Sequence, residues 1–369
     1  MSEWKEVKLE DILIIYDKKR RPLSSIQRSS FQGQYRYYGA QGIIDYIADY
    51  IFDGEYMLIA EDGENLNSRT QPIAQIVNGK FWVNNHAHIV RTNEKANMYL
   101  VMLILNNMNI SSYVTGAAQP KLNQDNLKRI SIYLPDKNEQ DIIAGILSSL
   151  DEKIETNNKL NEKLEEIAQA IFKSWFVDFE PFKDQPFHET EIGYIPQIFE
   201  SGVLGDLCTF KRGKGLLSKD AIQGDVPVIA GGMKPACYHN VANTKAPVVT
   251  VSGSGANAGY TQIHNVDVWA SDCSFIDSNC ENLYYAYCFL SRRPKLLKHS
   301  QTGAAQPHVK PADIHRFQVV IPSKEIINEF QQIVKPLFDR IGMNKIENDR
   351  LASLRDTLLP RLMSGEIKI

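Results

Sequence analysis

Two short runs of basic residues are the clearest candidates for a binding site in this sequence. They consist of Lys18, Lys19, Arg20 and Arg21 in the first half of the chain and of Lys211, Arg212 and Lys214 in the second half. Each run follows a similar short segment, at residues 8–12 and 203–207. Because two unlike sequences keep positive charge at the same place, the pattern favours contacts with nucleic-acid phosphates. For each run, a solvated surface loop is the alternative.

Two further groups could act as a nucleophile or as a metal site. Cys273 with His264 could form a nucleophile and its base, but Cys273 lies in a predicted strand, where a buried structural cysteine is the favoured interpretation. His86 and His88 alternate and would share one face of a strand, as metal ligands can. The sequence offers no apparent third ligand, so we predict neither a catalytic residue nor a metal site in this chain.

Two polar loops follow predicted strands at residues 56–60 and 247–251. The first loop reads E-D-G-E-N-L-N-S-R and ends with Arg69, whereas the second reads S-G-S-G-A-N-A-G and contains Ser254 and Asn257. Polar loops that differ on a shared scaffold are typical of recognition sites, so these three residues are candidate contacts. The second loop is rich in glycine, but no Gly-Lys-Ser/Thr follows it, which argues against nucleotide binding.

The elements that must position these residues occur twice. The hexapeptide T-G-A-A-Q-P lies at residues 115–120 and again at 302–307, a spacing of 187 residues (302 minus 115). Trp82 and Trp269 have the same spacing, so the chain is a tandem duplication. These tryptophans could stack on bases, but equivalent tryptophans in strands favour a place in the core.

Each copy reads as a mixed domain of short strands and helices. The predicted strands cover residues 3–16, 56–60, 82–90 and 130–135 in the first copy and residues 247–251, 269–277 and 317–322 in the second. Short apolar helices are predicted at 98–105 and 283–290. After each last strand the hydrophobic period changes to that of a long helix.

Apolar residues and asparagines recur at alternating steps of three and four over residues 147–175 and 334–362. A seam sustained over four heptads predicts two coiled-coil helices, each of roughly 38 residues and about 57 Å. Pro336 is expected to kink the second helix or to mark its true start, and Pro360 to disturb its last turn.

The asparagines in this seam predict how the two helices pair. In antiparallel helices the numbers of facing residues sum to a constant, and 505 places Asn157 opposite Asn348 and Asn161 opposite Asn344. A shifted pairing would bury an unpaired amide against leucine, so these layers would specify the register. The alternative is that the asparagines face solvent or a partner subunit.

Composition bounds the class of protein. The 369 residues are 43% hydrophobic and 23% charged, with a net charge of −3, so any nucleic-acid contact must come from local basic patches. The start of the chain has no signal-peptide core, and no apolar run reaches membrane-spanning length. The five cysteines lie in the second half, without a C-x-x-C, which argues against a disulfide framework. We expect a cytoplasmic protein.

The whole chain resembles the specificity subunit of a type I restriction–modification system. The resemblance rests on W-K-E-V-K-L-E-D-I at the start, both T-G-A-A-Q-P loops, I-F-K-S-W-F-V-D-F-E-P at 171–181 and R-L-M-S-G-E-I near the end. It implies an α+β fold, in which two target recognition domains are joined by two long antiparallel coiled-coil helices with an internal pseudo-two-fold repeat. The expected segments are domain 1 (1–137), helix 1 (138–180), a linker (181–195), domain 2 (196–323) and helix 2 (324–369).

The resemblance implies a non-catalytic subunit that reads a bipartite, asymmetric target in double-stranded DNA. It also implies docking of two methyltransferase subunits, through which restriction and translocase subunits join. S-adenosylmethionine, ATP and Mg are then expected in those partner subunits, with no cofactor in this chain and no membrane. Besides the basic runs, the resemblance adds as DNA-contact candidates Thr115, Gly116 and Gln119 in one copy and Thr302, Gly303 and Gln306 in the other.

Two other functions remain open from the sequence. One is a coiled-coil scaffold whose two heads bind protein or carbohydrate, and the other is a self-contained enzyme that uses Cys273 and His264. Salt-dependent binding to duplex DNA would distinguish a DNA reader from both.

Overall fold

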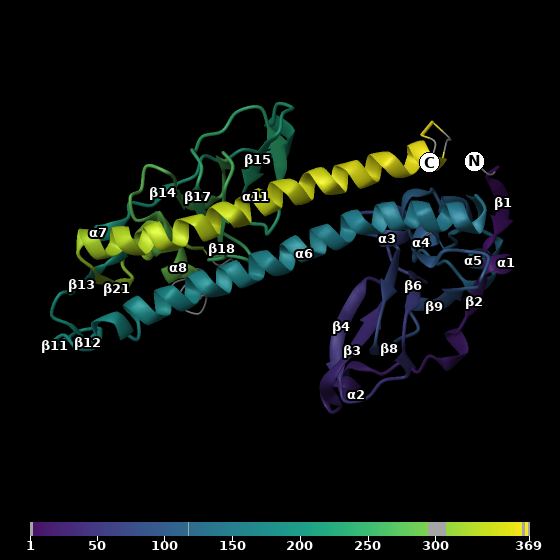
Figure 1. Ribbon diagram of the computed structural model, residues 1–369, viewed down its shortest axis with the longest axis horizontal. Coiled ribbons are helices and arrows are strands. Elements are labelled where there is room, and N and C mark those ends of the chain that lie inside the picture. The colour runs from purple at the N-terminus through teal and green to yellow at the C-terminus, as the bar shows by residue number, and fades with distance from the viewer. Residues whose placement is uncertain (1–2, 117, 294–307, 364–365, 368–369) are drawn as a thin grey trace. The chain divides into compact units, whose positions relative to one another are not determined.

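A computed structural model describes residues 3–116, 118–293, 308–363 and 366–367 (Figure 1). The chain divides into two compact units. Unit 1 comprises Met1–Lys153 with Leu351–Ile369, and unit 2 comprises Ile154–Arg350. The division crosses both long helices, α6 (Lys137–Phe176) and α11 (Lys324–Met363). Within the described residues, no helix combines the length and the apolar character that a membrane crossing requires.

Unit 1 is built from two four-stranded sheets and short helices. Its elements before α6 are β1 (Lys5–Lys8), α1 (Leu9–Ile12), β2 (Leu13–Ile15), η1 (Asp17–Lys19), α2 (Ser25–Ser29), β3 (Gln32–Gly39), β4 (Gly42–Ile47), β5 (Phe52–Asp53), β6 (Tyr56–Ala60), α3 (Asn65–Ser68), β7 (Ala74–Val77), β8 (Lys80–Val83), β9 (Ala87–Thr92), α4 (Met98–Asn107), η2 (Ser111–Tyr113), α5 (Gln124–Arg129) and β10 (Ser131–Leu134). One sheet has the order β2-β9-β6-β7 and the other β4-β3-β8-β5, while β1 pairs with β10.

Unit 2 repeats this plan. Its elements between the long helices are η3 (Glu180–Phe182), β11 (Phe187–Thr190), β12 (Gly193–Pro196), β13 (Glu200–Val203), α7 (Leu204–Leu207), β14 (Lys211–Arg212), η4 (Ser218–Asp220), β15 (Val226–Ile229), β16 (Cys237–His239), β17 (Val248–Ser252), β18 (Thr261–His264), β19 (Trp269–Ala270), β20 (Cys273–Ile276), α8 (Leu283–Ser291), α10 (Pro311–His315) and β21 (Gln318–Ile321). Its sheets have the orders β14-β20-β17-β18 and β16-β15-β19, and β13 pairs with β21.

The strand orders confirm the duplication that the sequence predicts. In the β4-β3-β8-β5 sheet of unit 1, β3 runs parallel to β8. In the β16-β15-β19 sheet of unit 2, the equivalent strand β15 runs parallel to β19. Both parallel pairs include the repeated tryptophan, through Tyr37 with Trp82 and Val228 with Trp269. The remaining strand pairs within the described sheets are antiparallel.

Two strand predictions were wrong in the same way. Residues 82–90 and 269–277 each read as one strand, but each stretch contains residues of two strands that belong to different sheets. In unit 1 the break is a turn in which the Asn84 side chain accepts a hydrogen bond from the His86 backbone. Likewise, residues 3–16 form β1 and β2 with the one-turn helix α1 between them.

Each unit has its own apolar core. In unit 1, side chains from both sheets, including Tyr56, Leu58, Phe81 and Ile89, pack between the sheets. A second cluster joins α4 to the ends of the long helices, where Leu147 of α6 lies with Leu359 and Leu362 of α11. The core of unit 2 packs α8 against the other ends of these helices.

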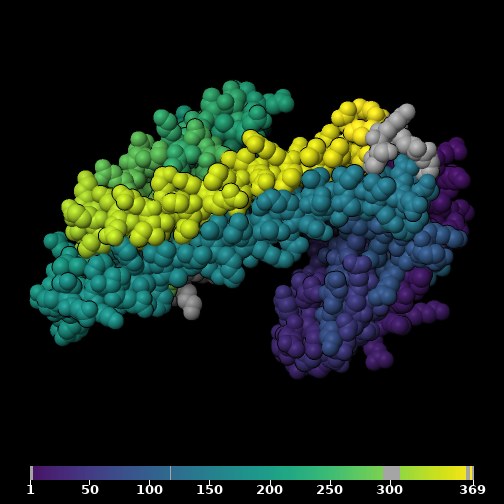
Figure 2. Space-filling model, viewed as in Figure 1, coloured from purple at the N-terminus to yellow at the C-terminus, as the bar shows by residue number. Residues whose placement is uncertain are grey.

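The long helices run in opposite directions along each other (Figure 1), and their surfaces touch within unit 2 (Figure 2). Helix α11 continues through Pro336 and Pro360, contrary to the expected kink or later start. Pro336 is exposed, so the backbone acceptor that it leaves free faces solvent. Helix α6 ends at Phe176, before residue 180, because the chain turns left-handed at Phe179 and Pro181 follows.

Candidate nucleic-acid interface

The basic loop of unit 1 places three of its four cations at the surface. Lys18 and Lys19 belong to the short helix η1, and they and Arg21 are exposed. Arg20 is different, because its guanidinium lies 2.6 Å from Glu61 Oε2 and donates to the Ala87 carbonyl at 2.9 Å. Its side chain is only 15% exposed, so Arg20 holds the interior of unit 1 together, in contrast to the phosphate contact expected from the sequence.

A tryptophan fixes the end of the basic loop in both units. The indole Nε1 of Trp82 donates to the carbonyl of Arg21 at 2.5 Å, and that of Trp269 donates to the carbonyl of Lys214 at 2.8 Å. Trp82 is 8% exposed, which confirms its predicted place in the core, whereas Trp269 is half-buried. The spacing of 187 residues identified the pair, but the sequence alone did not indicate that both anchor the basic loops.

Beneath the loop of unit 1 lies a buried network of charged side chains. His88 Nδ1 is 2.6 Å from Asp17 Oδ2, and His88 Nε2 is 2.7 Å from the Leu122 carbonyl. Both ring nitrogens of His88 therefore have a hydrogen-bonding partner inside unit 1. Burial alone would raise the pKa of Asp17, but the hydrogen bond and the charge of His88, together with a bond from the Ile89 amide, lower it overall.

This network links the basic loop to the loop that carries T-G-A-A-Q-P. Glu61, which pairs with Arg20, also lies 3.4 Å from Lys121 Nζ, and its carbonyl accepts from the Leu122 amide at 2.7 Å. The Gly63 amide donates to the Pro120 carbonyl at 3.1 Å. The three stretches that the sequence singled out in this copy therefore meet at one place.

The same cluster offers the donor types of a metal site, in Asp17, Glu61 and His88. Protein groups already occupy these donor atoms, because Arg20 lies against both carboxylates and both ring nitrogens of His88 have partners. We therefore assign it a structural role. The sequence suggested that His86 and His88 share one face of a strand, but this was wrong. His86 lies in the turn before β9, with its ring 2.7 Å from Asp62.

The T-G-A-A-Q-P loop of unit 1 is a tight, exposed turn. Thr115 and Lys121 exchange backbone hydrogen bonds of 2.9 and 2.7 Å, and Thr115, Gly116 and Gln119 are exposed. Gly116 has a φ of +88°, and a Cβ there would lie 2.3 Å from the Gln119 carbonyl oxygen, so only glycine fits. The corresponding Thr302, Gly303 and Gln306 of unit 2 lie outside the described residues.

Unit 2 also brings its candidate loops together. Arg212 forms an ion pair with Asp272, which also accepts from the Ser254 hydroxyl. Ser254 forms a β-bridge with His308, the residue that follows the second T-G-A-A-Q-P loop. Lys211 and Lys214 are exposed, and Asn257 is half-buried, with its carbonyl accepting from the Tyr260 amide at 2.9 Å.

Arg69 has a structural role that its sequence did not reveal. Its Nη2 lies 2.9, 2.8 and 3.2 Å from the carbonyls of Leu105, Asn106 and Met108, at the end of α4. These carbonyls lack helical partners, so the guanidinium caps the helix. Burial lowers the pKa of Arg69, in keeping with its position inside unit 1.

The residues considered for enzyme chemistry are packed in the core of unit 2. Cys273 is fully buried in β20, and its sulfur is 3.6 Å from the Ile229 carbonyl. Burial raises the pKa of its thiol to about 12, and the His264 ring bonds instead to the Thr250 hydroxyl at 2.8 Å. The interpretation of Cys273 as a structural cysteine is confirmed.

The seam asparagines meet between the long helices in unit 2. Asn344 Nδ2 donates to Asn161 Oδ1 at 2.7 Å, and Asn348 Nδ2 donates to Asn158 Oδ1 at 2.8 Å. The contacts of Asn161 with Asn344 and of Asn157 with Asn348 are the pairing that a sum of 505 predicts, and Asn158 is one residue away from it. That the asparagines specify the register stays a prediction.

Comparisons with known proteins all point to the same family. The profile of the type I restriction modification DNA specificity domain matches residues 1–166 and 196–355. The type I restriction enzyme MjaIX specificity subunit of Methanocaldococcus jannaschii is 31% identical over 278 residues, which cover 69% of this chain and 64% of that protein. The HindI specificity subunit of Haemophilus influenzae is 26% identical over 85% of this chain and 84% of its own length.

A solved structure shares the fold. The crystal structure of a type I restriction–modification S subunit from M. genitalium superposes with a TM-score of 0.63 at 18% identity, covering 98% of this chain and 96% of that one. The fold is thus the α+β arrangement of two mixed domains with two long antiparallel helices. With the profile covering both halves, the chain belongs to the type I restriction–modification DNA specificity family.

Proposed function

We propose that this chain is the non-catalytic, DNA-reading subunit of a type I restriction–modification enzyme, and that each unit reads one half of an asymmetric bipartite duplex target. One observation carries the proposal. In both units the same scaffold joins a basic loop to a polar loop and to the residue that follows a T-G-A-A-Q-P segment, while the loop sequences differ. Shared positioning with unlike side chains suits two readers of different base sequences.

The long helices are proposed to dock two methyltransferase subunits. Support comes from apolar side chains that α6 and α11 leave at the surface, among them Ile142, Ile146, Leu354 and Met343, which are 42–55% exposed. Exposed apolar residues on a helix favour contact with a protein partner. Restriction and translocase subunits would join through the methyltransferase subunits, and S-adenosylmethionine, ATP and Mg²⁺ would bind in those partners.

The target is best tested in the assembled complex. The chain is expressed with its methyltransferase subunits in cells that lack other DNA methylation, and the methylated bases are mapped. We expect a single gapped motif with unlike halves. A matched variant with Ser254→Ala and Asn257→Ala is expected to change only one half. A contiguous or palindromic motif would contradict the proposal, as would methyl transfer by the pure single chain.

Duplex binding by the complex provides an independent measurement. Affinity for an oligonucleotide that contains the mapped motif should fall steeply as salt rises, because phosphate contacts release counterions. Binding that is weak and insensitive to salt would instead favour a scaffold whose heads bind protein or carbohydrate.

A further inference from the structure

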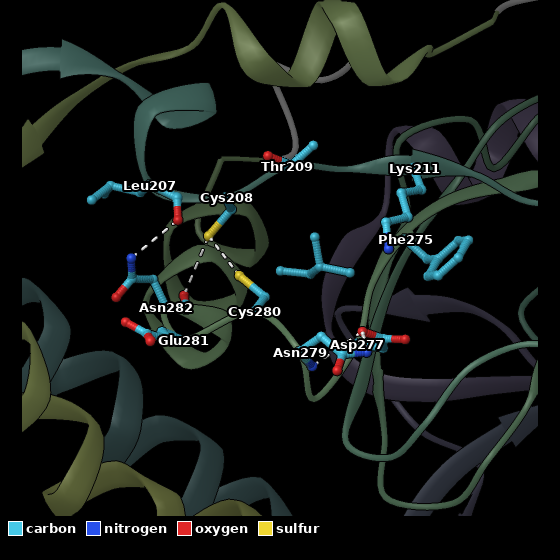
Figure 3. A pocket seen from close by; sticks show the side chains of 11 residues that line it. Leu207, Cys208, Thr209, Lys211, Phe275, Asp277, Asn279, Cys280, Glu281 and Asn282 are labelled. Atoms are coloured by element: carbon cyan, nitrogen blue, oxygen red, sulfur yellow. Dashed lines mark hydrogen bonds between the residues drawn. The ribbon is translucent and has the colours of Figure 1, made fainter.

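Two cysteines of unit 2 that are far apart in the sequence lie with their thiols in contact. The Sγ atoms of Cys208 and Cys280 are 3.2 Å apart and point towards one another (Figure 3). Cys208 directly follows α7, and Cys280 lies in the turn between β20 and α8. Backbone and side-chain hydrogen bonds hold both segments, since Asn282 Nδ2 donates to the Leu207 carbonyl at 3.0 Å and the Cys280 amide to the Asp277 carbonyl at 2.8 Å.

This thiol pair is accessible from one side. Both cysteines line a cleft of about 330 Å³, whose opposite wall includes Lys211 and Asp277 (Figure 3). Cys280 is half-buried, whereas Cys208 behind it is buried. The other cysteines differ, because Cys273 and Cys288 are fully buried and Cys237 is half-buried on β16.

The two thiols are not chemically equivalent. The hydrogen bond between the two sulfurs lowers the pKa of Cys280, although burial opposes this shift. The same hydrogen bond, reinforced by burial, raises the pKa of Cys208. Cys280 is therefore the more acidic thiol and lines the cleft, and Cys208 lies behind it with its sulfur 3.6 Å from the Asn282 carbonyl.

Unit 1 has no thiol pair at the equivalent junction, because all five cysteines lie in the second half of the chain. There, Asn93 joins the two segments, with its Nδ2 donating to the Asp11 carbonyl at 2.9 Å and its amide to the Ile12 carbonyl at 2.9 Å. The general fold does not require cysteines at this place, so they are a property of unit 2.

We propose that Cys208 and Cys280 are a site of reversible oxidation, which forms an intramolecular disulfide when a hydroperoxide enters the cleft. The Cys280 thiolate attacks one peroxide oxygen, the O–O bond breaks, and the departing oxygen takes a proton to leave as water or an alcohol. Cys280 is now a sulfenic acid. The Cys208 sulfur then attacks the Cys280 sulfur, the S–O bond breaks, and the Cys208 proton leaves with the hydroxyl as water.

The electron balance of this reaction is complete. Two electrons pass from the sulfur pair to the peroxide, and a dithiol reductant returns them by thiol–disulfide exchange. The sulfur atoms must approach from 3.2 Å to the length of a disulfide bond, about 2.05 Å, a shift that two facing side chains can make. The bond would link the end of α7, which precedes the basic strand β14, to the turn before α8.

The test uses the full-length chain and hydrogen peroxide. After brief treatment the remaining thiols are alkylated, and the protein is digested and analysed by mass spectrometry. We expect a peptide pair cross-linked through Cys208 and Cys280, lighter by two hydrogen atoms and released by dithiothreitol. Cys280 should be consumed roughly tenfold faster than Cys237, the other half-buried thiol.

Single variants separate the two roles. In Cys208→Ser the peroxide should stop at a Cys280 sulfenic acid that dimedone traps, and in Cys280→Ser the Cys208 thiol should stay reduced. Cys237→Ser is the control and should form the cross-link as the wild type does. The proposal is overturned if Cys208 and Cys280 are both alkylated after a treatment that oxidises Cys237, or if the disulfides formed join Cys237 or two chains.

Discussion

The side-chain amide of Asn157 donates a hydrogen bond of 2.9 Å to Oδ1 of Asn348, across the seam between α6 and α11. The same amide lies 2.8 Å from Glu347 Oε2. Asn157 and Asn344 are each 1% exposed, so amides take the place of leucine inside the seam. A shift of one heptad would set most of these amides against apolar residues without a partner, so we expect them to favour this register.

Replacing Asn157 alone with leucine should lower the free energy of unfolding by about 1–2 kcal/mol, because Asn348 and Glu347 lose a donor. Replacing Asn157, Asn161, Asn344 and Asn348 together should raise it by roughly 2–4 kcal/mol, since leucines bury apolar surface and leave fewer polar groups unpaired. Urea denaturation of both variants measures this. A single variant that is more stable than the wild type would contradict the argument.

The sequence predicted the elements that repeat and the helices that pair. A heptad repeat places its residues on one face of a helix. The pairing of Asn157 with Asn348 therefore follows from their positions in the two repeats. The spacing of 187 residues likewise predicted equivalent strands, and Tyr56–Ala60 is confirmed as β6. Local patterns of this kind need no knowledge of distant neighbours.

The roles of individual polar residues could not be predicted, because distant segments decide them. Arg20 and Arg69 look like surface cations in the sequence, yet Glu61 and the end of α4 enclose them. Cys208 and Cys280 form no local motif, and only the packing of α7 beside the turn before α8 brings them together. The break inside residues 82–90 was missed because both strands are apolar and the turn is short.

The exposed cations of the basic loops are expected to contact DNA phosphates. Changing Lys18, Lys19 and Arg21 to glutamine in the assembled complex should weaken binding to all duplex sequences. The slope of the logarithm of the DNA-binding constant against the logarithm of salt concentration should become shallower by about 1 for each lost contact. Changing Lys211 and Lys214 should do the same. Titrations at several salt concentrations measure both quantities. Wild-type affinity and salt slope in both variants would show that these loops do not bind phosphate.

Arg20→Gln is the matched control within the same loop. It should lower the free energy of unfolding by roughly 3 kcal/mol, because it leaves the buried Asp17 and Glu61 carboxylates short of a cation. The salt slope of the folded complex should stay near the wild-type value. A lower salt slope of DNA binding without a loss of stability would indicate that Arg20 contacts a phosphate after all.

The tryptophan anchors can be tested without changing any charge. Trp82→Phe removes the hydrogen bond to the Arg21 carbonyl and should lower the free energy of unfolding by about 1–2 kcal/mol. Because the loop keeps its cations but loses its fixed end, DNA affinity should fall while the salt slope is retained. Trp269→Phe should behave alike through the Lys214 carbonyl. Equal affinity for both variants and the wild type would mean that loop position does not matter for binding.

The network around Asp17 gives a prediction for pH. Folding lowers the pKa of Asp17 below its unfolded value of about 3.9. Its ionised form is therefore stabilised by folding. That contribution is fully present above pH 4 and is lost as pH falls through the folded pKa.

Asp17→Asn removes this contribution and sets an amide N–H against the donating His88 ring. The free energy of unfolding should drop by roughly 2–4 kcal/mol at pH 7, and the difference from the wild type should shrink below pH 4. Denaturant titrations between pH 7 and pH 3 measure the difference, with Asp49→Asn as an exposed control that should change little. A difference that stays constant across this range would show that the charge of Asp17 does not stabilise unit 1.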